Sequence, residues 1–316
     1  MKVLHLTNNF PTKQNPIFGI FVKEQIDSLI KVGINCEVFF INGREKGKIE
    51  YFIQIIKLSK LLVKNNYDII HCHHSLSAIC LLLTFKSKKF KKILSFQNSP
   101  EKETFKFIIS IFKKKFDALI TKNKLNNSFK FYNIPNGVNT SFFKRINRNV
   151  ALSKLRLSAN KKYVLFVSSN FIRKQKRFDI FEKVIKILKK DYKTKEIDSL
   201  VLTKSSRDLI PYYFSVASVH LLCSDFEGSP NSVKEALAVG LPVISTDVGN
   251  VKEMISGLKN SYVSESNDPK YLAELVYKTI YKKSKNQDEG LERINNLKLD
   301  INSVALKIKK LYDNII

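Results

Sequence analysis

Cysteine pairs, long apolar runs and acidic residues are all scarce in this sequence. The four cysteines are scattered and form no Cys-x-x-Cys pair, which excludes the dense disulfide framework of small secreted domains. The longest apolar runs, such as Ala78–Phe85, fall well short of the ~20 residues that a membrane-spanning helix needs. Residues 1–8 reach polar side chains too early for the apolar core of a signal peptide. We therefore expect a cytoplasmic protein, with any membrane contact peripheral.

The 28 acidic residues stand against 55 lysines and arginines, a formal net charge of +27. A field of this sign favours nucleic acid, anionic lipid or phosphorylated small molecules. The excess is larger in residues 1–148, which hold 26 basic and 9 acidic residues. A lysine-rich genome would explain part of it, so charge alone does not choose the partner. Because the sequence has no zinc-finger spacing, glycine–aromatic RNA-binding signature or basic leucine zipper, we expect no nucleic acid.

Short runs rich in Val, Ile and Phe alternate with longer amphipathic stretches, which predicts parallel strands joined by helical crossovers. A turn at Ile134–Val138 and a basic stretch at Lys144–Asn149 end the first unit, so we place the first domain at residues 1–148. Its predicted strands are Val3–Thr7, Cys36–Ile41, Ile69–His73, Ile93–Phe96, Ala118–Thr121 and Phe131–Ile134.

The same alternation restarts and predicts a second domain over residues 149–300, with a helix over Phe178–Lys190. From Pro269 onward the apolar spacing is helical, and residues 301–316 are predicted to form a helix that packs back on the first domain. Two such open sheets facing a cleft would bind ligands at the carboxyl ends of their strands. The second set of predicted strands is Tyr163–Ser168, Ser199–Leu202, Val219–Cys223, Pro242–Thr246 and Tyr262–Val263.

The segment Phe226–Glu235, which reads FEGSPNSVKE, carries the most specific chemical signal. Its two glutamates, Glu227 and Glu235, stand eight positions apart, between a predicted strand end and a predicted helix start. Gly228 lets the backbone approach a ligand closely, and the following hydroxyls, amide and free helix-end N–H groups suit a phosphate. The residues expected to bind a ligand that carries a diphosphate are Gly228, Ser229, Pro230, Asn231, Ser232 and Glu235.

This segment resembles the retaining glycosyltransferases of the GT-B fold, known as glycosyl transferases group 1 or family 4, whose hallmark is two glutamates separated by seven residues. The next stretch, Ala236–Gly249 (ALAVGLPVISTDVG), is also similar to that family. The resemblance implies an α/β fold of two Rossmann-like domains with parallel sheets facing a cleft, followed by C-terminal helices. It also implies that Glu227 lies beside the donor sugar and that Glu235 accepts hydrogen bonds from the ribose.

Three further segments extend the resemblance over most of the chain. The loop that ends at Gly19 is similar to the family's glycine loop, the segment Tyr67–His74 to its third strand, and Ile134–Val138 with Phe142-Phe143 to its domain junction. The resemblance implies that Gly19 contacts the donor and that His73, Gln97 and Asn98 meet the acceptor or the sugar.

The basic loop after the first strand of the second domain is expected to neutralise the leaving diphosphate. Lys176 matches the family's lysine, whereas the family's earlier arginine is replaced by Ser169 or Asn170, so Arg173 or Lys174 is the expected substitute. Gln97 is another departure, because many family members carry a histidine there and glutamine cannot shuttle a proton. The predicted catalytic residues are therefore Glu227, Lys176 and Arg173.

No metal or other cofactor is expected. The run His71–His74 offers imidazole and thiolate, but on a strand alternate side chains point to opposite faces, so these four residues cannot converge on one ion. The sequence also has no Asp-x-Asp, the carboxylate pair with which the other major transferase fold holds a metal. A helix end and cations would then stabilise the diphosphate.

Two stretches of the first domain, Lys86–Lys92 and Phe105–Phe116, mix lysines with aromatic residues. This mixture suits an anionic lipid surface, and we expect a peripheral site on the inner face of the cell membrane. The alternative is a solvated helix whose Phe107, Ile108 and Ile111 form one buried stripe.

The sequence thus predicts a metal-independent glycosyltransferase that moves a sugar from a nucleoside diphosphate to a hydroxyl of a glycan or lipid-linked acceptor. The resemblance suggests cell-surface polysaccharide biosynthesis as the pathway. The alternatives are a catalytically inactive GT-B partner subunit, which the changes at Ser169/Asn170 and at Gln97 would suit, and a GT-B nucleotide-sugar epimerase.

Overall fold

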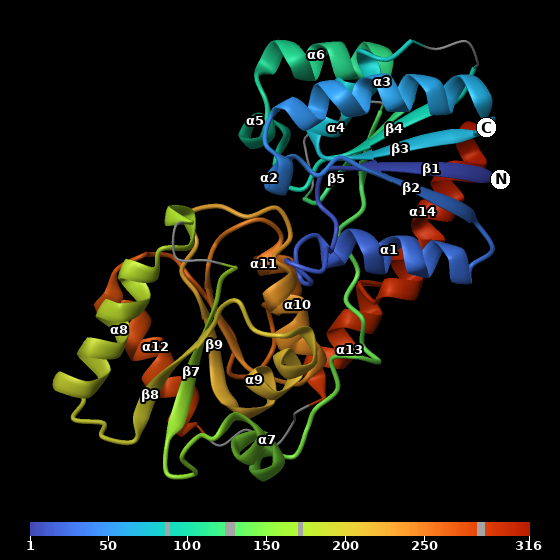
Figure 1. Cartoon of the computed structure of the whole chain (residues 1–316). Helices are drawn as coiled ribbons and strands as arrows, with labels where there is room; N and C mark the ends of the chain where they lie inside the picture. Colours follow the sequence, from blue (N-terminus) through green and yellow to red (C-terminus); the bar gives the residue numbers. More distant parts are fainter. Residues whose placement is uncertain (86–88, 124–129, 170–172, 283–287) are drawn as a thin grey trace. The chain divides into compact units, whose positions relative to one another are not determined.

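The chain forms two compact α/β units in the computed structural model, drawn whole in Figure 1. The structure describes residues 1–85, 89–123, 130–169, 173–282 and 288–316. Unit 1 comprises Met1–Gly137 together with Ile301–Ile316, and unit 2 comprises Val138–Asp300. Among the described residues, none of the helices combines the length and the apolar content needed to cross a bilayer.

Unit 1 contains a six-stranded parallel sheet in the order β2-β1-β3-β4-β5-β6. Because β1 pairs with β2 on one side and β3 on the other, the strand order reverses between β1 and β3, and this switch point is where open α/β sheets bind ligands. The strands are β1 Lys2–Thr7, β2 Asn35–Phe40, β3 Ile69–His73, β4 Lys91–Ser95, β5 Ala118–Thr121 and β6 Phe131–Asn133.

Helices cover both faces of this sheet. On one face Leu58, Leu81 and Phe112, from α3, α4 and α6, share a core with Leu4 and Leu94 of the strands, and Figure 1 draws α3 and α6 on the same side. The opposite face is covered by α1 and α14, the latter bringing in the C-terminal residues. The helices of unit 1 are α1 Ile20–Lys31, α2 Gly43–Lys46, α3 Ile49–Lys64, α4 Ser75–Leu82, α5 Pro100–Glu103, α6 Lys106–Lys115 and α14 Ile301–Ile315.

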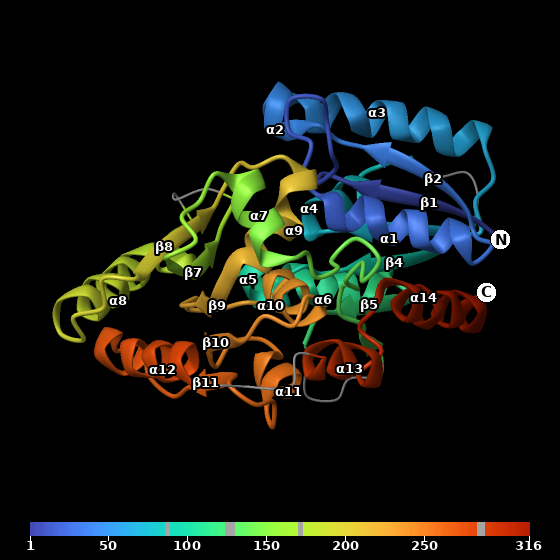
Figure 2. The ribbon, with the colours of Figure 1, turned by 90° about the horizontal axis from the view of Figure 1, so that it is seen from below.

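Unit 2 contains a five-stranded parallel sheet in the order β11-β10-β9-β7-β8, whose switch point lies between β7 and β9. Helices α8 and α12 pack together over one face, as Figure 2 shows from below. The strands are β7 Lys162–Val167, β8 Ile197–Leu202, β9 Ala217–Leu222, β10 Val243–Thr246 and β11 Tyr262–Ser264. The helices are α7 Arg148–Leu155, η1 Lys174–Lys176, α8 Phe178–Lys190, η2 Arg207–Leu209, α9 Ile210–Val216, α10 Asn231–Ala238, α11 Val251–Ile255, α12 Pro269–Tyr281 and α13 Glu289–Asn296.

The boundary between the units lies at Gly137/Val138, earlier than the expected residue 148. Val138 bridges Asp300 and its N–H donates to Leu299, while Phe143 packs edge-on against Phe214 of α9. The polar stretch over residues 144–149 is therefore part of unit 2, where residues 148 and 149 begin α7.

Candidate functional site

The predicted catalytic residues of unit 2 lie at its switch point. The loop after β7 carries Arg173 and Lys176, and the loop after β9 carries Glu227 before it enters α10. Because β7 and β9 are neighbouring parallel strands, both loops leave the sheet at the same edge. A backbone hydrogen bond from Asp225 N–H to the Gln175 carbonyl, 2.8 Å long, joins them. The two motifs are therefore close in space although they are about 50 residues apart in the sequence.

Glu227 and Lys176 form an ion pair between these loops. The Lys176 Nζ lies 2.6 Å from the Glu227 Oε1, and both side chains are about nine-tenths buried, at 10% and 11% exposure. The Ser224 hydroxyl donates a second hydrogen bond to the same carboxylate at 2.7 Å. A carboxylate held by two donors in a sparsely hydrated place keeps its position when charge develops nearby.

The Glu227 loop is seated on a glycine. Gly249 has φ +57°, and a Cβ at this position would lie 2.3 Å from the Gly228 carbonyl oxygen. Only glycine permits both the left-handed backbone and this close approach. The Thr246 hydroxyl holds the base of the same loop by donating to the Ser224 carbonyl at 2.7 Å.

Helix α10 begins directly after Pro230, with Asn231 as its first residue. The first turn of a helix has N–H groups without intrahelical partners, which suits a phosphate. Glu235 follows one turn after Asn231, on the same side of the helix. The predicted donor-binding residues of unit 2 are therefore gathered in one loop and one and a half turns of helix.

Ser232, although one of these residues, has its hydroxyl engaged inside the unit. His220 is fully buried, and burial lowers its pKa to about 4, so the ring is neutral at pH 7. Its Nδ1–H donates to the Leu165 carbonyl at 3.1 Å, which leaves Nε2 to accept from the Ser232 hydroxyl at 3.0 Å. The Ser232 side chain can therefore offer a ligand only acceptor lone pairs.

Arg173 lies at the N-cap of η1, half-buried, and its carbonyl accepts from the Lys176 N–H at 2.9 Å. Asn170, at the position where the family arginine is missing, lies outside the described residues. Sequence reasoning overlooked Arg177, whose guanidinium binds Asp179 and Asp225, each at 3.0 Å, and so ties the two loops together. It also overlooked Lys234, a fully buried lysine of α10.

At position 19 in unit 1 the backbone conformation and the close packing also require glycine. It caps α1 with φ +69°, and a Cβ would lie 2.3 Å from the Asn9 carbonyl carbon and oxygen. The loop after β1 is therefore folded closely onto the start of α1, at the switch point of this sheet.

His73 is buried inside unit 1, in a cluster with His5 and His71, whereas the prediction had placed it in contact with the acceptor or sugar. His5 Nδ1 lies 3.0 Å from His73 Nε2, and His71 bonds Tyr312 and Ser95 at 2.6 and 2.7 Å. The cause is that residues 71 and 73 face the core through which α14 packs. His74 is the histidine of this strand end that reaches solvent.

The three buried histidines have ring nitrogens within 4.8 Å of one another, but their geometry suits a hydrogen-bonded cluster better than a metal site. The lone pairs of an imidazole lie in the ring plane, so a bound ion must lie in the plane of every ligating ring. His71 and His73 stack with centroids 4.3 Å apart and an interplanar angle of 22°, which keeps their planes apart. Both nitrogens of His71 also have hydroxyl partners.

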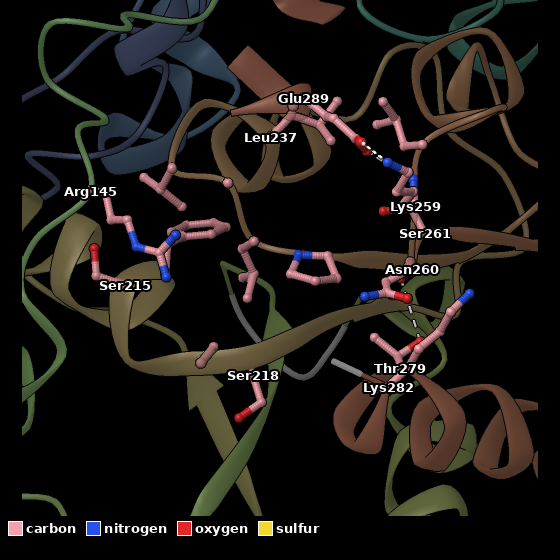
Figure 3. Close-up of a pocket in the computed structure, with 18 of the residues that line it drawn as sticks. Arg145, Ser215, Ser218, Leu237, Lys259, Asn260, Ser261, Thr279, Lys282 and Glu289 are labelled. Atoms are coloured by element: carbon pink, nitrogen blue, oxygen red, sulfur yellow. Dashed lines mark hydrogen bonds and ion pairs between the residues drawn. The ribbon is translucent and has the colours of Figure 1, made fainter. Parts of the chain in front are cut away.

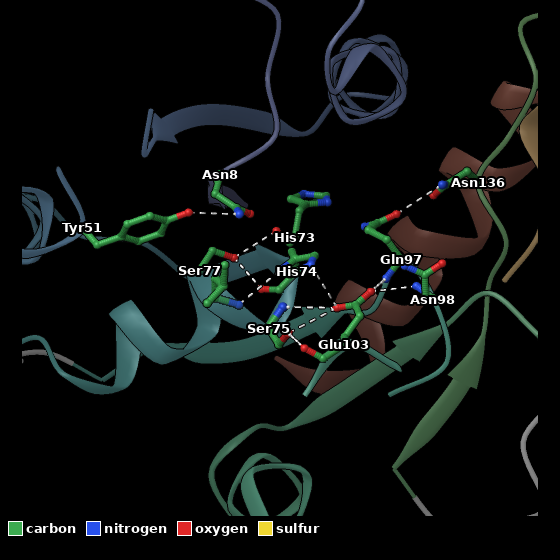
Figure 4. Close-up of polar contacts among 11 residues, drawn as sticks. Asn8, Tyr51, His73, His74, Ser75, Ser77, Gln97, Asn98, Glu103 and Asn136 are labelled. Carbon is green, nitrogen blue, oxygen red and sulfur yellow. Dashed lines mark hydrogen bonds and ion pairs between the residues drawn. The ribbon is translucent and has the colours of Figure 1, made fainter. Parts of the chain in front are cut away.

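Gln97 and Asn98 are held by a buried carboxylate at the same edge of unit 1 (Figure 4). Their backbone N–H groups both donate to Glu103 Oε1, the second at 2.7 Å, and Asn136 donates to the Gln97 side chain at 3.3 Å. His74, with an unusual φ of +89°, lies 3.8 Å from the same carboxylate. The arrangement presents amides and an imidazole at the carboxyl end of the strands.

A cavity of about 270 Å³ in unit 2 lies at the opposite edge of the sheet, where Leu241, Asn260 and Ser261 lead into the strands (Figure 3). The C-termini of α9, α10 and α12 end against it. Helix C-termini carry partial negative charge, which Lys259, Lys282 and the neighbouring arginines offset. The cavity therefore does not suit a diphosphate as the first turn of α10 does.

Two family models match the chain, and both describe glycosyltransferases. The model of glycosyl transferases group 1 matches residues 161–281, and the model of glycosyl transferase 4-like proteins matches residues 19–130. No curated protein sequence matches the chain.

Solved structures resemble both units at once, at low sequence identity. Sucrose-phosphate synthase from Thermosynechococcus elongatus is 16% identical with a TM-score of 0.76, covering 99% of this chain and 98% of that one. The catalytic domain of starch synthase IV from Arabidopsis thaliana, bound to ADP and acarbose, is 12% identical with a TM-score of 0.75, covering 100% and 99%. HepE from Anabaena, in complex with UDP-glucose, is 14% identical with a TM-score of 0.72, covering 99% and 100%. These solved structures and the two parallel sheets show the GT-B fold. The two family models together match most of the chain, and with the motif at Glu227 and Glu235 they show that it belongs to the group 1, family 4-like glycosyltransferases.

Proposed function

We propose that this glycosyltransferase moves a sugar from a nucleoside diphosphate to a hydroxyl of a glycan or lipid-linked acceptor, with retention of configuration, in cell-surface polysaccharide biosynthesis. The observation that carries the proposal is the meeting of the Lys176–Glu227 ion pair, the Gly228 loop and the first turn of α10 at one switch point. The solved relatives in complex with UDP-glucose and with ADP support a nucleotide sugar as the donor.

The diphosphate would lie at the start of α10, with Lys176 beside it. Backbone N–H groups of the first helical turn donate to its oxygens, and the ammonium balances the charge that builds up as the sugar bond breaks. No metal is needed for this, because the helix end and the lysine supply the positive potential. Glu235, one turn further on, is in the range of a ribose bound to that diphosphate.

Glu227 would act on the sugar rather than on the diphosphate. Its carboxylate is fixed by Lys176 and Ser224, so it can accept hydrogen bonds from sugar hydroxyls without moving. In a retaining transfer the acceptor oxygen attacks the face from which the phosphate leaves, and the departing phosphate takes the acceptor proton. A protein base is then unnecessary, and Gln97 in place of a histidine is compatible with activity.

A transfer assay tests this function. Radiolabelled UDP-, GDP- and ADP-sugars are incubated with the chain and a lipid extract, and label in the glycan or lipid product is counted. We expect transfer with one donor, its loss in Glu227→Ala, and the same anomeric configuration in donor and product by NMR. Interconversion of donor sugars without transfer would favour the epimerase, and donor binding without any turnover would favour the inactive partner.

We also propose that unit 1 acts at the inner face of the cell membrane, and one face of its sheet supports this. The outer sides of α3, α4 and α6 and their flanking loops expose many large apolar side chains, led by Phe85 at 86% and Phe105 at 72%. The set comprises Ile49, Phe52, Ile53, Ile56 and Val63 on α3, Leu76, Leu83 and Phe85 in and after α4, and Phe105, Phe107 and Ile111 at α6. We call these residues the three-helix apolar face.

Lysines are interspersed with this face. Lys57, Lys60 and Lys64 are exposed on α3, and Lys113–Lys115 end α6. Each lysine near anionic headgroups contributes about 1 kcal/mol, and each buried aromatic side chain adds apolar area. Apolar residues framed by lysines fit an anionic lipid surface, which is the partner we propose for this face.

A further inference from the structure

Lys234 is a buried lysine within the α10 segment. It is the fourth residue of the helix, and its side chain is fully buried, at 0% exposure. Helical side chains lean towards the N-terminus of their helix, and the Nζ accordingly reaches back to Ser229, with 3.1 Å between Nζ and Oγ. Ser229 is in the loop that leads from Glu227 into α10, so the lysine lies directly behind this loop.

In this hydrogen bond the Lys234 Nζ is the donor. An ammonium group can only donate, so the Ser229 oxygen is the acceptor and keeps its own hydrogen for another partner. Among the residues that the structure describes, no acceptor takes that hydrogen. Donation from a charged group also polarises the hydroxyl and makes it a stronger donor.

Ser229 and Ser232 therefore differ, although both belong to the same motif. The Ser232 hydroxyl donates to His220 Nε2, whereas the Ser229 hydroxyl accepts from Lys234. Of these two serines, Ser229 is therefore the one that can offer a hydroxyl hydrogen to an anion at the start of α10. Positive charge behind the positive end of a helix is favourable when an anion binds in front of it.

We infer that Lys234 is a positioning residue for the diphosphate, which orients and polarises the Ser229 hydroxyl so that it donates to a phosphate oxygen. The inference rests on the proposed function and adds a residue to it. It also gives the donor site a cation from α10, in a sequence that has no arginine at 169 or 170.

Calorimetric titration of the full chain with UDP, GDP, ADP and inorganic pyrophosphate tests the inference. With the tightest of these probes, Ser229→Ala should weaken binding about tenfold, the loss of one hydrogen bond to a charged group. Lys234→Met, which keeps the length of the side chain, should weaken binding at least as much. Because the two residues act through one hydroxyl, the double variant should lose less than the product of the two single losses.

Two controls separate positioning from structure. Lys186→Met removes an equal charge from an exposed position of α8 and should leave the affinity within about twofold. The Ser229→Ala variant keeps the buried lysine. The thermal unfolding of this variant reports whether the chain stays folded when only the hydroxyl is removed.

The outcomes are distinguishable. If the unaltered chain binds a probe but Ser229→Ala binds it equally well, or if the two losses multiply, the inference is wrong and the proposed function stands. If the folded chain binds none of the probes, the proposed function itself fails and the inference with it.

Discussion

Glu227 and Glu235 belong to the same motif, but substitution of each should change a different kinetic constant. Glu227 is fixed beside Lys176, where we propose that the sugar bond breaks, so Glu227→Ala should lower kcat by about 10²-fold. Glu235 is further along α10, so Glu235→Ala should chiefly raise the KM for the donor. Steady-state kinetics with varied donor separates the two effects. Unchanged kinetics in both variants would refute the assignment.

Substitution of Gly249 tests how closely the Glu227 loop packs against this glycine. Gly249→Ala adds a Cβ 2.3 Å from the Gly228 carbonyl, so the loop must shift, at a cost of about 1–3 kcal/mol for overpacking besides backbone strain. We expect lower stability in denaturant unfolding and weaker donor binding. Gly257→Ala is the matched control, because Gly257 also has positive φ but its nearest neighbour is 3.7 Å away. It should lose only the strain of about 1–2 kcal/mol and keep donor affinity.

The buried histidines predict a loss of stability in acid. Burial lowers the pKa of His5 to about 3 and those of His71 and His73 well below 6.5. Below pH ~6.5 the histidines of the unfolded chain therefore bind protons while those of the folded chain stay neutral. The free energy of unfolding has its full value above pH ~6.5 and declines as the pH falls towards the pKa values of the folded chain.

Denaturant unfolding at pH 7 and pH 4.5 measures this effect. The free energy of unfolding should fall with pH, and it should fall less in His5→Gln, which keeps a polar side chain but does not titrate. The carboxylates are common to both proteins, so the difference isolates the histidine. Equal falls in the two proteins would contradict the expectation.

Among the elements, the positions of the strands could be predicted from the sequence, but the exposed faces of the helices could not. Strands buried on both sides read as short apolar-rich runs; β3 and β5 have the predicted bounds, while β9 begins at Ala217 instead of Val219. For α6 the prediction of a buried stripe through Phe107 and Ile111 was wrong, since they are 65% and 42% exposed while Ile109 and Phe112 are buried. Apolar residues occupy both sides of this helix, so periodicity could not choose the buried one.

The three-helix apolar face gives a prediction at the scale of elements. In flotation with liposomes, the chain should bind vesicles that contain anionic lipid and not neutral ones. Phe52→Ser combined with Ile56→Ser on α3 should reduce the bound fraction several-fold, because two exposed apolar side chains no longer enter the lipid. Leu306→Ser, also an exposed apolar residue but on α14 over the other face, is the control and should still float. Equal flotation with neutral vesicles would reject the membrane proposal.

At the scale of the whole molecule, the sequence predicted two α/β units and the family, and the structure and the comparisons confirm both. The donor-binding residues of unit 2 could be proposed from the sequence because they are contiguous in one motif. The Lys176–Glu227 pair, the His5 contribution to the buried cluster and the Lys234–Ser229 bond depend on which strands are neighbours and on helix direction. Single-sequence patterns do not contain that information.

Metal independence belongs to the proposed chemistry and is tested on the complete enzyme. Because α10, Lys176 and Arg173 would supply the positive potential, we expect full transfer rates in excess chelator. The assay compares the rate with and without EDTA after dialysis. Complete loss of activity that divalent metal restores would contradict the proposed chemistry.

The central claim is that unit 2 binds a nucleoside diphosphate sugar at the Glu227–Glu235 motif, and a thermal-shift screen tests it most directly. The purified chain is heated with UDP-, GDP-, ADP- and CMP-linked sugars, because a ligand that binds only the folded state raises the unfolding temperature. We predict a clear rise with one nucleotide, and its loss in Glu235→Ala. A folded protein that shows no shift with any donor at millimolar concentration would contradict the claim.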